Sequence, residues 1–356
     1  MTTDVLTADA ACDVVAYDDG YAIEEPGSSA GTGHGRGRGS RDKGGLEVVS
    51  RAAEYPASSV STATVVRDLV ELTKPRITMM ILTTTVATAL VGAGGMVSFS
   101  DLFLLLLGTG LVSGSAGAAN QIWERVIDRN MPRTLVRPLP SGRISTGMAT
   151  AFMGSIGTLG TAVLWYRFGA VPTAVGLVTW LSYVFIYTPM KTRTSMNTTI
   201  GAIAGALPML IGYTALGGSL ADGTAWLLFG VLAAWQYPHF MAIAWLYRKQ
   251  YGEAGFQMST TVDPTGRWAA FQSVTGSLTV IACGIGLSCI STGLFANSVI
   301  AGSIATTAVV LATFPMLKAS VRFAFERSDV TARRLLRSSL VVLPAVLAVV
   351  TVRVFW

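Results

Sequence analysis

Charged side chains are scarce in this chain of 356 residues. Only 13% of the residues are Asp, Glu, Lys or Arg, whereas soluble domains carry about 25%. Hydrophobic residues make up 51% of the chain, and the mean hydropathy is +0.53. This balance excludes an ordinary soluble protein and indicates a polytopic membrane protein. The net charge of +6 fits basic loops on one side of a bilayer, so we expect a lipid bilayer and no nucleic acid as partner.

Cysteine and histidine are also rare. The three cysteines, Cys12, Cys283 and Cys289, show no CxxC or metal-binding spacing, so no disulfide framework is predicted. Cys283 and Cys289 lie in an apolar run, where cysteine usually acts as a small hydrophobic residue. The two histidines are His34 and His239. Because His34 falls in the N-terminal tail, any imidazole chemistry within the membrane has to use His239.

Large apolar residues are few before residue 60. This segment is first acidic and then rich in Gly, Ser and Arg, a composition that cannot bury a core and predicts a disordered cytoplasmic tail. It also lacks the basic start and apolar run of a secretory signal. A short amphipathic helix is expected over 61–73. We therefore divide the chain into a tail, residues 1–60, and a membrane domain, residues 61–356.

Apolar segments of about 20 residues, the length that crosses a bilayer, recur through the rest of the chain. They lie at 77–95, 102–122, 147–166, 169–187, 197–216, 224–246, 269–290, 296–316 and 338–355. The sequence therefore predicts an all-α polytopic membrane protein with about nine transmembrane helices.

Basic residues are concentrated in alternate loops. One set of loops holds Lys74, Arg76, the segment 125–143, Lys191, Arg193, Arg248, Lys249, Arg267 and the segment 318–337. The opposite set has little beyond Asp101, Arg167 and Asp222. The positive-inside rule places the basic set and the N-terminus in the cytoplasm and Trp356 outside. We expect a multi-pass protein of the cell inner (plasma) membrane with a cytoplasmic-side active site.

The segment 120–140 is the most polar stretch next to an apolar helix. Asn120, Glu124 and Asp128 are four residues apart and share one face of a helix. Pro132 is expected to end that helix near residue 130 or 131. The loop that follows carries Arg133, Thr134 and Arg137. Charge at the end of a membrane helix is costly and marks a functional site.

A second polar cluster lies between the fourth and fifth predicted spans, at 187–197. Lys191 and Arg193 are cations suited to an anion, and Tyr187 and Asn197 are candidate hydrogen-bonding partners. Ordinary basic anchoring of a cytoplasmic loop explains the same cations equally well.

A third cluster ends the sixth predicted span. Pro238 should kink the helix and free a backbone carbonyl, and Gln236 and His239 are close by. A histidine in this position is more often a packed, hydrogen-bonded residue than a ligand. The segment 247–253 then adds further tyrosines and charged residues.

Carboxylates, basic residues and an apolar bundle together suit the chemistry of a diphosphate ester on a long hydrocarbon chain. Carboxylate and water oxygens hold Mg²⁺, and Lys and Arg stabilise a departing diphosphate. Among the helices, a dry cavity would protect a carbocation from early capture by water.

The motifs also carry a family resemblance. Segment 120–138 (Asn-x3-Glu-x3-Asp-x2-Met-x-Arg-Thr-x2-Arg-Pro) resembles the first acidic motif of the UbiA superfamily of intramembrane prenyltransferases, in the form found in its protohaem IX farnesyltransferase (haem O synthase) branch. Segment 72–77 resembles the start of that family's first helix. Segments 187–208 and 235–255 resemble its middle and sixth-helix signatures. The resemblance runs from about residue 70 to the C-terminus.

One position departs from the family pattern. The family usually reads Asp-Tyr where this chain has Gln250-Tyr251, so the second acidic motif lacks its main carboxylate. Glutamine offers a cation an oxygen but no charge. Glu253, one turn on, or a water can take the place of that carboxylate. Either the second metal is held more weakly, or the first motif carries most of the metal binding, or activity is reduced or altered.

The resemblance implies transfer of a farnesyl group from farnesyl diphosphate to a vinyl group of haem b, which gives haem O. It implies Mg²⁺ as cofactor, held by Asn120, Glu124, Asp128 and Glu253. The implied substrate-binding residues are Arg76, Arg133, Arg137, Arg193, Tyr187, Asn197, Gln236, Arg248, Gln250 and Tyr251. Lys191 is the implied catalytic cation, and His239 is expected to contact the haem or orient a water. A haem A synthase or a terminal oxidase assembly is the expected protein partner.

Two other functions stay open at this point. A prenyltransferase acting on an aromatic quinone precursor would share the acidic motif and the cation, and would differ only in its acceptor pocket. A transporter would need charge deep within several spans, whereas the charges of this chain cluster at the span ends.

Overall fold

The computed structural model describes residues 62–290 and 299–355, and every regular element in these ranges is helical. The predicted tail, residues 1–60, lies outside the described residues. Nine helices in the described part are long and apolar enough to cross a membrane, as predicted. They are α4 (Pro75–Ala93), α5 (Phe99–Glu124), α7 (Thr146–Phe168), α8 (Ala170–Leu181) with its continuation η2 (Ser182–Tyr187) and α9 (Thr188–Met190), α10 (Asn197–Ala215), α11 (Gly223–Leu246), α14 (Arg267–Cys289), α15 (Val299–Phe325) and α16 (Asp329–Phe355).

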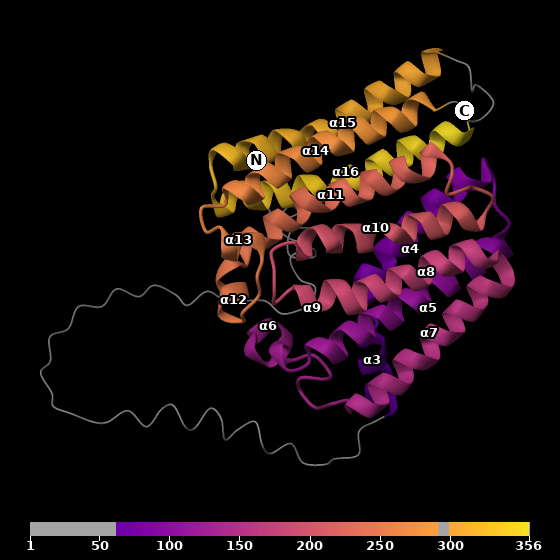
Figure 1. Cartoon of the computed structure of the whole chain (residues 1–356). Helices are drawn as coiled ribbons and strands as arrows, with labels where there is room; N and C mark the ends of the chain where they lie inside the picture. Colours follow the sequence, from indigo (N-terminus) through magenta and orange to yellow (C-terminus); the bar gives the residue numbers. More distant parts are fainter. Residues whose placement is uncertain (1–61, 291–298, 356) are drawn as a thin grey trace, which may run out of the picture.

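Short helices connect the spans at one end of the bundle. They are α3 (Thr62–Leu72), η1 (Ile127–Asn130), α6 (Pro132–Leu135), α12 (Arg248–Glu253) and α13 (Ser259–Val262). Figure 1 shows α6, α9, α12 and α13 together at the left-hand end, whereas the C-terminal end of α16 lies at the opposite end. The predicted amphipathic helix over 61–73 is confirmed by α3. All three polar clusters of the sequence therefore belong to the same end of the molecule.

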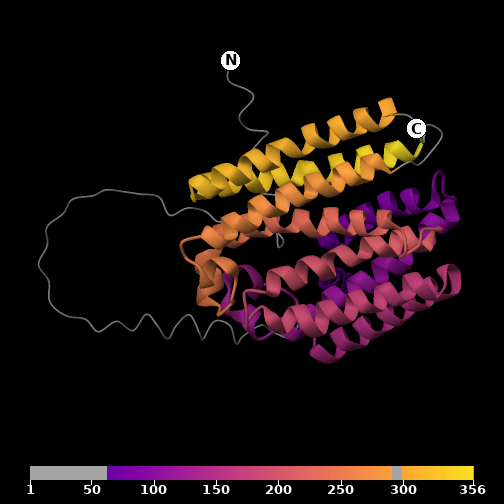
Figure 2. The same cartoon turned by 45° about the horizontal axis from the view of Figure 1, so that its top comes forward.

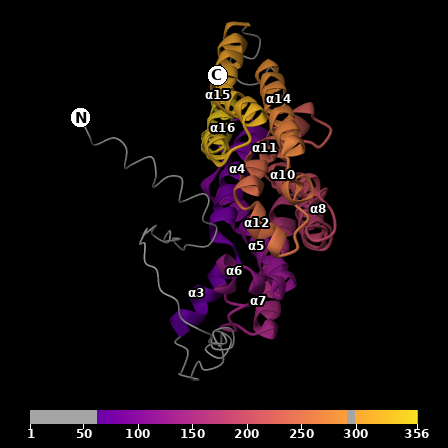
Figure 3. The same cartoon turned by 90° about the vertical axis from the view of Figure 1, so that its left-hand side faces the viewer.

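The long helices run side by side along one direction (Figure 2). Helix α4 packs against α5, α10 and α16, and α11 packs against α10, α14 and α16. In the view onto the end that carries the short helices, α12 and α6 lie below α4 and α16, and α3 and α7 lie below α6 (Figure 3).

Close helix packing depends on glycine at particular positions. A Cβ at Gly212 of α10 would lie 2.6 Å from the carbonyl oxygen of Thr85 in α4. A Cβ at Gly205 would lie 2.5 Å from Oε1 of Gln236, and one at Gly201 would lie 2.6 Å from the ring of Tyr187. These glycines allow backbones and site side chains to approach, as small residues do in membrane bundles.

Two helix boundaries differ from the sequence predictions. Helix α5 ends at Glu124 rather than near residue 130, and a single 3-10 turn, η1, then carries Asp128. The stretch 318–337, predicted as a loop, belongs mostly to α15 and α16. Hydropathy locates only the lipid-crossing part of a helix, and Lys, Arg and Ala continue it into water because they have high helix propensity.

Candidate active site

The acidic cluster consists of Asn120, Glu124 and Asp128. Their exposed fractions are 0%, 6% and 1%. Asn120 and Glu124 belong to the last turn of α5, and Asp128 lies on η1. The prediction of one continuous helix was wrong, but the carboxylates of Glu124 and Asp128 still interact electrostatically. The 3-10 turn therefore returns Asp128 to the same buried site.

A cationic side chain contacts an oxygen of every member of this cluster. Lys74 Nζ donates to Asn120 Oδ1 over 2.8 Å. Lys191 Nζ is 2.9 Å from Glu124 Oε1, and Arg137 Nη1 is 3.0 Å from Asp128 Oδ2. We call these cations the site cations. Three elements far apart in sequence supply them, so the site forms only when the bundle is complete.

Asn120 is held from both sides of its amide. While Oδ1 accepts from Lys74, Nδ2 donates to Thr188 Oγ1 over 2.9 Å. The Thr188 hydroxyl in turn donates to the carbonyl of Tyr183 over 2.9 Å. This chain of bonds fixes which atom of the amide is the oxygen, so Oδ1 is the atom directed at positive charge.

Lys74 was not among the predicted site residues. It lies between α3 and α4 with φ 53° and ψ 63°, and it is the one non-glycine residue with positive φ in residues 62–290 and 299–355. The signal in the sequence was a lysine directly before Pro75 at the start of the first span. Composition alone could not separate it from a lysine that anchors the loop to headgroups.

Burial makes the charges in the site strongly interdependent. Burial raises the pKa of the Asp128 carboxyl above its ordinary value, and Arg137 beside it offsets this only in part. Burial alone lowers the pKa of Lys191, but the Glu124 carboxylate outweighs that effect and raises it above its ordinary value. Lys191 is therefore charged at neutral pH, and Asp128 gains from any further positive charge placed near it.

The second polar cluster divides into residues inside and outside the site. Tyr187 lies beneath Lys191, whose Nζ is 4.8 Å from the ring centre. Asn197 is buried and donates to the carbonyls of Thr194 (2.7 Å) and Gln257 (2.8 Å), so it ties two loops together. Arg193 is exposed at the same end of the bundle, and so is Arg76 at the start of α4.

The loop after α11 covers the loop after α5. The Arg133 guanidinium lies over the rings of Tyr247 and Tyr251, at 5.2 Å and 5.9 Å from their centres. Met131, Ala254 and Phe256 form a small apolar core between the two loops. The predicted second motif is therefore brought onto the first.

Three predicted site residues of this second loop differ from one another in burial and contacts. Gln250 is half-buried, and Glu253 is exposed. Arg248 donates to Asp329 Oδ1 over 2.8 Å and stacks on Trp245, which ties α12 to α16. Within residues 62–290 and 299–355, no three His, Cys, Asp or Glu side chains come together as a metal site. Glu253 thus does not join the carboxylates of the first motif in this structure.

His239 is held in a defined orientation within the bundle. Its Nδ1 is 3.0 Å from Ser339 Oγ, and that hydroxyl also donates to the carbonyl of Leu336 over 2.7 Å. Because the serine hydroxyl donates to Leu336, the neutral tautomer that fits has Nδ1–H donating to Ser339 Oγ and Nε2 as the acceptor nitrogen. The ring stacks on Trp235 at 4.6 Å. Nearby, Gln236 Nε2 donates to the carbonyl of Ala202 over 2.9 Å.

The family model of the UbiA prenyltransferase family matches residues 80–341. The chain belongs to this family. The acidic cluster, Arg137 and Lys191 lie within the matched residues.

Relatives match this family member over nearly their whole length. A protohaem IX farnesyltransferase from Rhodopirellula baltica is 57% identical over 285 residues, which cover 80% of this chain and 99% of the relative. Another from Solibacter usitatus is 39% identical, over 79% of this chain and 96% of the relative.

Solved structures share the fold at low sequence identity. A digeranylgeranylglyceryl phosphate synthase superposes with a TM-score of 0.63 at 14% identity and covers 81% of this chain and 98% of its own. A UbiA homologue from Archaeoglobus fulgidus bound to GPP and Mg²⁺ gives a TM-score of 0.56 at 15% identity, over 80% of this chain and 99% of its own. At this identity the likeness establishes the fold alone.

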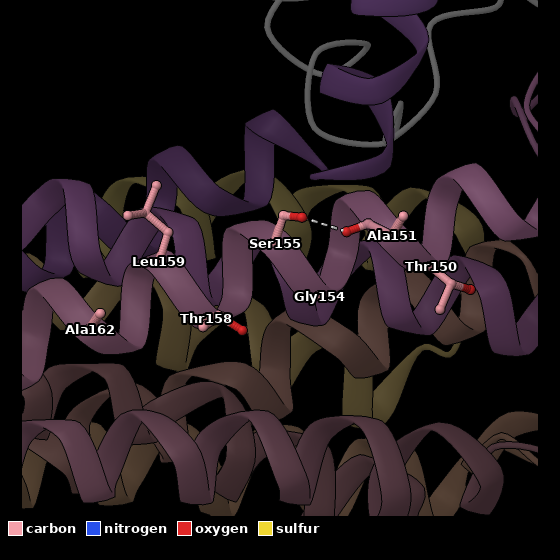
Figure 4. A pocket seen from close by; sticks show the side chains of 7 residues that line it. All are labelled: Thr150, Ala151, Gly154, Ser155, Thr158, Leu159 and Ala162. Carbon is pink, nitrogen blue, oxygen red and sulfur yellow. Dashed lines mark hydrogen bonds between the residues drawn. The ribbon is translucent and has the colours of Figure 1, made fainter.

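A shallow groove on the exposed face of α7 is unrelated to this site. Its lining residues are Thr150, Ala151, Gly154, Ser155, Thr158, Leu159 and Ala162 (Figure 4). They are small or apolar, and the Ser155 hydroxyl is already bonded to the carbonyl of Ala151 over 2.9 Å. The groove therefore lacks the charged groups that diphosphate chemistry requires.

Proposed function

We propose that this UbiA prenyltransferase transfers the farnesyl group of farnesyl diphosphate to a vinyl group of haem b and gives haem O. The observation that carries the proposal is the buried acidic cluster with its site cations, at the end of an apolar bundle. Relatives that carry the name protohaem IX farnesyltransferase, matched over nearly their full length, support haem as the acceptor.

The donor oxygens of this cluster suit Mg²⁺, an oxygen-binding cation that proteins usually hold through one or two carboxylates together with water and substrate phosphates. We assign Asn120 Oδ1 and the carboxylates of Glu124 and Asp128 as the oxygens that would hold it. The site cations support this fit, because they show that all three oxygens are already directed at positive charge. When bound, Mg²⁺ would neutralise charge on the diphosphate oxygens.

The basic residues bind the diphosphate end of the donor. Lys191 and Arg137 lie at the acidic cluster, and Arg133 is held beside it over Tyr247 and Tyr251. As the allylic carbon–oxygen bond breaks, its electron pair leaves with the diphosphate, and these cations stabilise the charge that develops. The farnesyl chain lies among the apolar helices, where the carbocation is kept from water.

The acceptor side of the reaction uses the middle of the bundle. The terminal vinyl carbon of haem b attacks the allylic cation and forms the new carbon–carbon bond. The cation that remains beside the porphyrin ring then takes up water and loses a proton, which leaves a hydroxyl group. We assign His239 to this water, because in the neutral tautomer that fits Ser339 the Nε2 atom is an acceptor.

The orientation in the membrane follows from the basic end of the bundle. We place this end in the cytoplasm of the cell and the chain in the plasma membrane. Farnesyl diphosphate would then reach the site from the cytoplasm, and the expected consumer of the product is a haem A synthase or a terminal oxidase assembly.

Haem extraction is the experiment that tests the function. Haems are extracted from cells that express the chain, separated by hydrophobicity and weighed by mass spectrometry. We expect a new haem that is heavier by one farnesyl group and one hydroxyl group, absent from cells with an empty vector and from cells that express Glu124→Gln. Unchanged haem b, with the protein present in the membrane, would point to an aromatic acceptor instead.

Replacing Gln250 with Asp tests the departure in the second motif. The change places a negative charge beside Tyr251 on a side chain one methylene shorter, so the apparent Mg²⁺ affinity of farnesyl transfer should tighten or stay the same. It is measured from initial rates over a Mg²⁺ titration in membranes. Gln250→Glu is the matched variant, because it adds the same charge and keeps the length of the side chain. A sharp loss of activity in Gln250→Asp would show that the glutamine amide has a role of its own.

A further inference from the structure

The site cations contact the same oxygens that we assign to the metal. Lys74 Nζ is 2.8 Å from Asn120 Oδ1, and Lys191 Nζ is 2.9 Å from Glu124 Oε1. A magnesium ion would need those oxygens at about 2.0–2.1 Å. At such short range two cations on one oxygen repel strongly, so each lysine has to leave its oxygen before a metal can bind there.

Lys74 adopts a backbone conformation that glycine would adopt more easily. The left-handed region is strained for a residue with a Cβ, and Lys74 has φ 53°. Such strain persists where the surroundings impose it, and it is found at functional sites. This position nevertheless carries a long cationic side chain and not glycine.

The surrounding structure imposes this conformation from α5. A Cβ at Gly117 would lie 3.2 Å from the carbonyl oxygen of Thr73, so the α3–α4 corner is pressed onto α5 one turn before Asn120. Gln121 Nε2 donates to the carbonyls of Glu71 (3.2 Å) and Leu72 (3.3 Å). The corner is thus fixed directly beside Asn120, with the Lys74 ammonium on its amide oxygen.

We propose that Lys74 and Lys191 act as stand-in cations, which occupy the metal-ligand oxygens until metal and diphosphate arrive together and then bind the diphosphate. A metal that arrives alone must displace two ammonium groups from the oxygens of Asn120 and Glu124 within a buried, poorly solvated region, which is costly. A diphosphate that arrives with the metal gives each ammonium a new anionic partner. Lys74 is thereby a diphosphate-positioning residue. This inference rests on the proposed metal site.

Metal binding without turnover tests the inference. The full chain is purified in lipid nanodiscs, and Mn²⁺ affinity is measured by electron paramagnetic resonance, first alone and then with inorganic pyrophosphate. We expect wild-type protein to bind Mn²⁺ weakly alone and far more tightly with pyrophosphate. Lys74→Gly should bind Mn²⁺ alone about tenfold more tightly, since one like charge near the ligand oxygens has been removed, and should gain less from pyrophosphate.

Controls separate charge removal from structural damage. Lys249→Met removes an exposed lysine of α12 at the same end of the bundle, and both of its affinities should equal those of wild type. The thermal midpoint of Lys74→Gly should stay the same or rise, because glycine relieves the strain. If Lys74 had only a structural role, its replacement by glycine would lower that midpoint. Lys191→Gln is the second variant and should also bind Mn²⁺ alone more tightly.

The outcomes distinguish the stand-in role of the lysines from the assignment of the metal site. If Lys74→Gly and Lys191→Gln bind Mn²⁺ alone no more tightly than wild type, while Glu124→Gln loses binding, the stand-in role is wrong and the metal site stands. If Glu124→Gln and Asp128→Asn bind Mn²⁺ as wild type does, the metal assignment itself is wrong. Should Lys191→Gln fail to fold, Lys74→Gly decides, because the Asn120 amide that Lys74 contacts carries no charge.

Discussion

Asp128→Asn is expected to lower haem farnesylation by about 10²–10³-fold at saturating Mg²⁺, the loss typical when one preorganised electrostatic group is removed from an active site. The amide keeps the size of the side chain and still offers Arg137 an oxygen, so the loop geometry should survive. What is lost is the negative charge next to Glu124. Farnesylated haem formed per amount of folded protein in membranes, with excess farnesyl diphosphate, measures the effect.

The matched control for this prediction is Glu326→Gln. Glu326 is an exposed carboxylate between α15 and α16, at the same end of the bundle, and its neutralisation should leave the rate unchanged. Equal turnover in Asp128→Asn and wild type would show that the carboxylate of Asp128 does not hold the metal. An equal loss in both variants would indicate a general effect of surface charge instead.

The number and order of the spans followed from hydropathy because lipid selects strongly for long apolar helices. The residues at which the helices end could not be predicted from hydropathy. Helix α15 continues past Lys318 to Phe325, since charged residues with high helix propensity extend a helix beyond the membrane. Helix α5 stops at Glu124, eight residues before Pro132. No breaker marks that point, and the tertiary contacts of Asp128 and Arg137 favour the tighter turn there.

The site was predicted in outline from residue type, and the resemblance to the UbiA family is confirmed by the family match. Spacing and charge identified Asn120, Glu124 and Asp128, and their convergence survived the wrong helix boundary. Lys74 was missed because its role depends on a strained corner pressed against α5, which no local pattern records. Asn197 donates hydrogen bonds to backbone carbonyls in the structure. A sequence cannot show which polar groups already have hydrogen-bond partners within the protein. Its assignment to substrate binding stays a prediction.

Gly212→Ala is expected to destabilise the folded chain by about 1–3 kcal/mol, the usual cost of overpacking. The new Cβ would lie 2.6 Å from the Thr85 carbonyl oxygen and even closer to the Thr88 hydroxyl. Backbone cannot move aside as a flexible side chain can, so α10 and α4 must separate. Because α4 begins directly after Lys74, the separation also shifts a site cation, and farnesyl transfer should fall together with the thermal midpoint.

Gly154→Ala is the matched control, since a Cβ there meets nothing within 4 Å. Alanine favours a helix over glycine by about 1 kcal/mol, so this variant should keep or raise the midpoint measured by thermal unfolding in detergent. The same substitution thus has opposite expected signs at two glycines of the same bundle. Equal midpoints for Gly212→Ala and Gly154→Ala would mean that α4 and α10 can move apart without a loss of stability. The position of Lys74 would then not depend on their close contact.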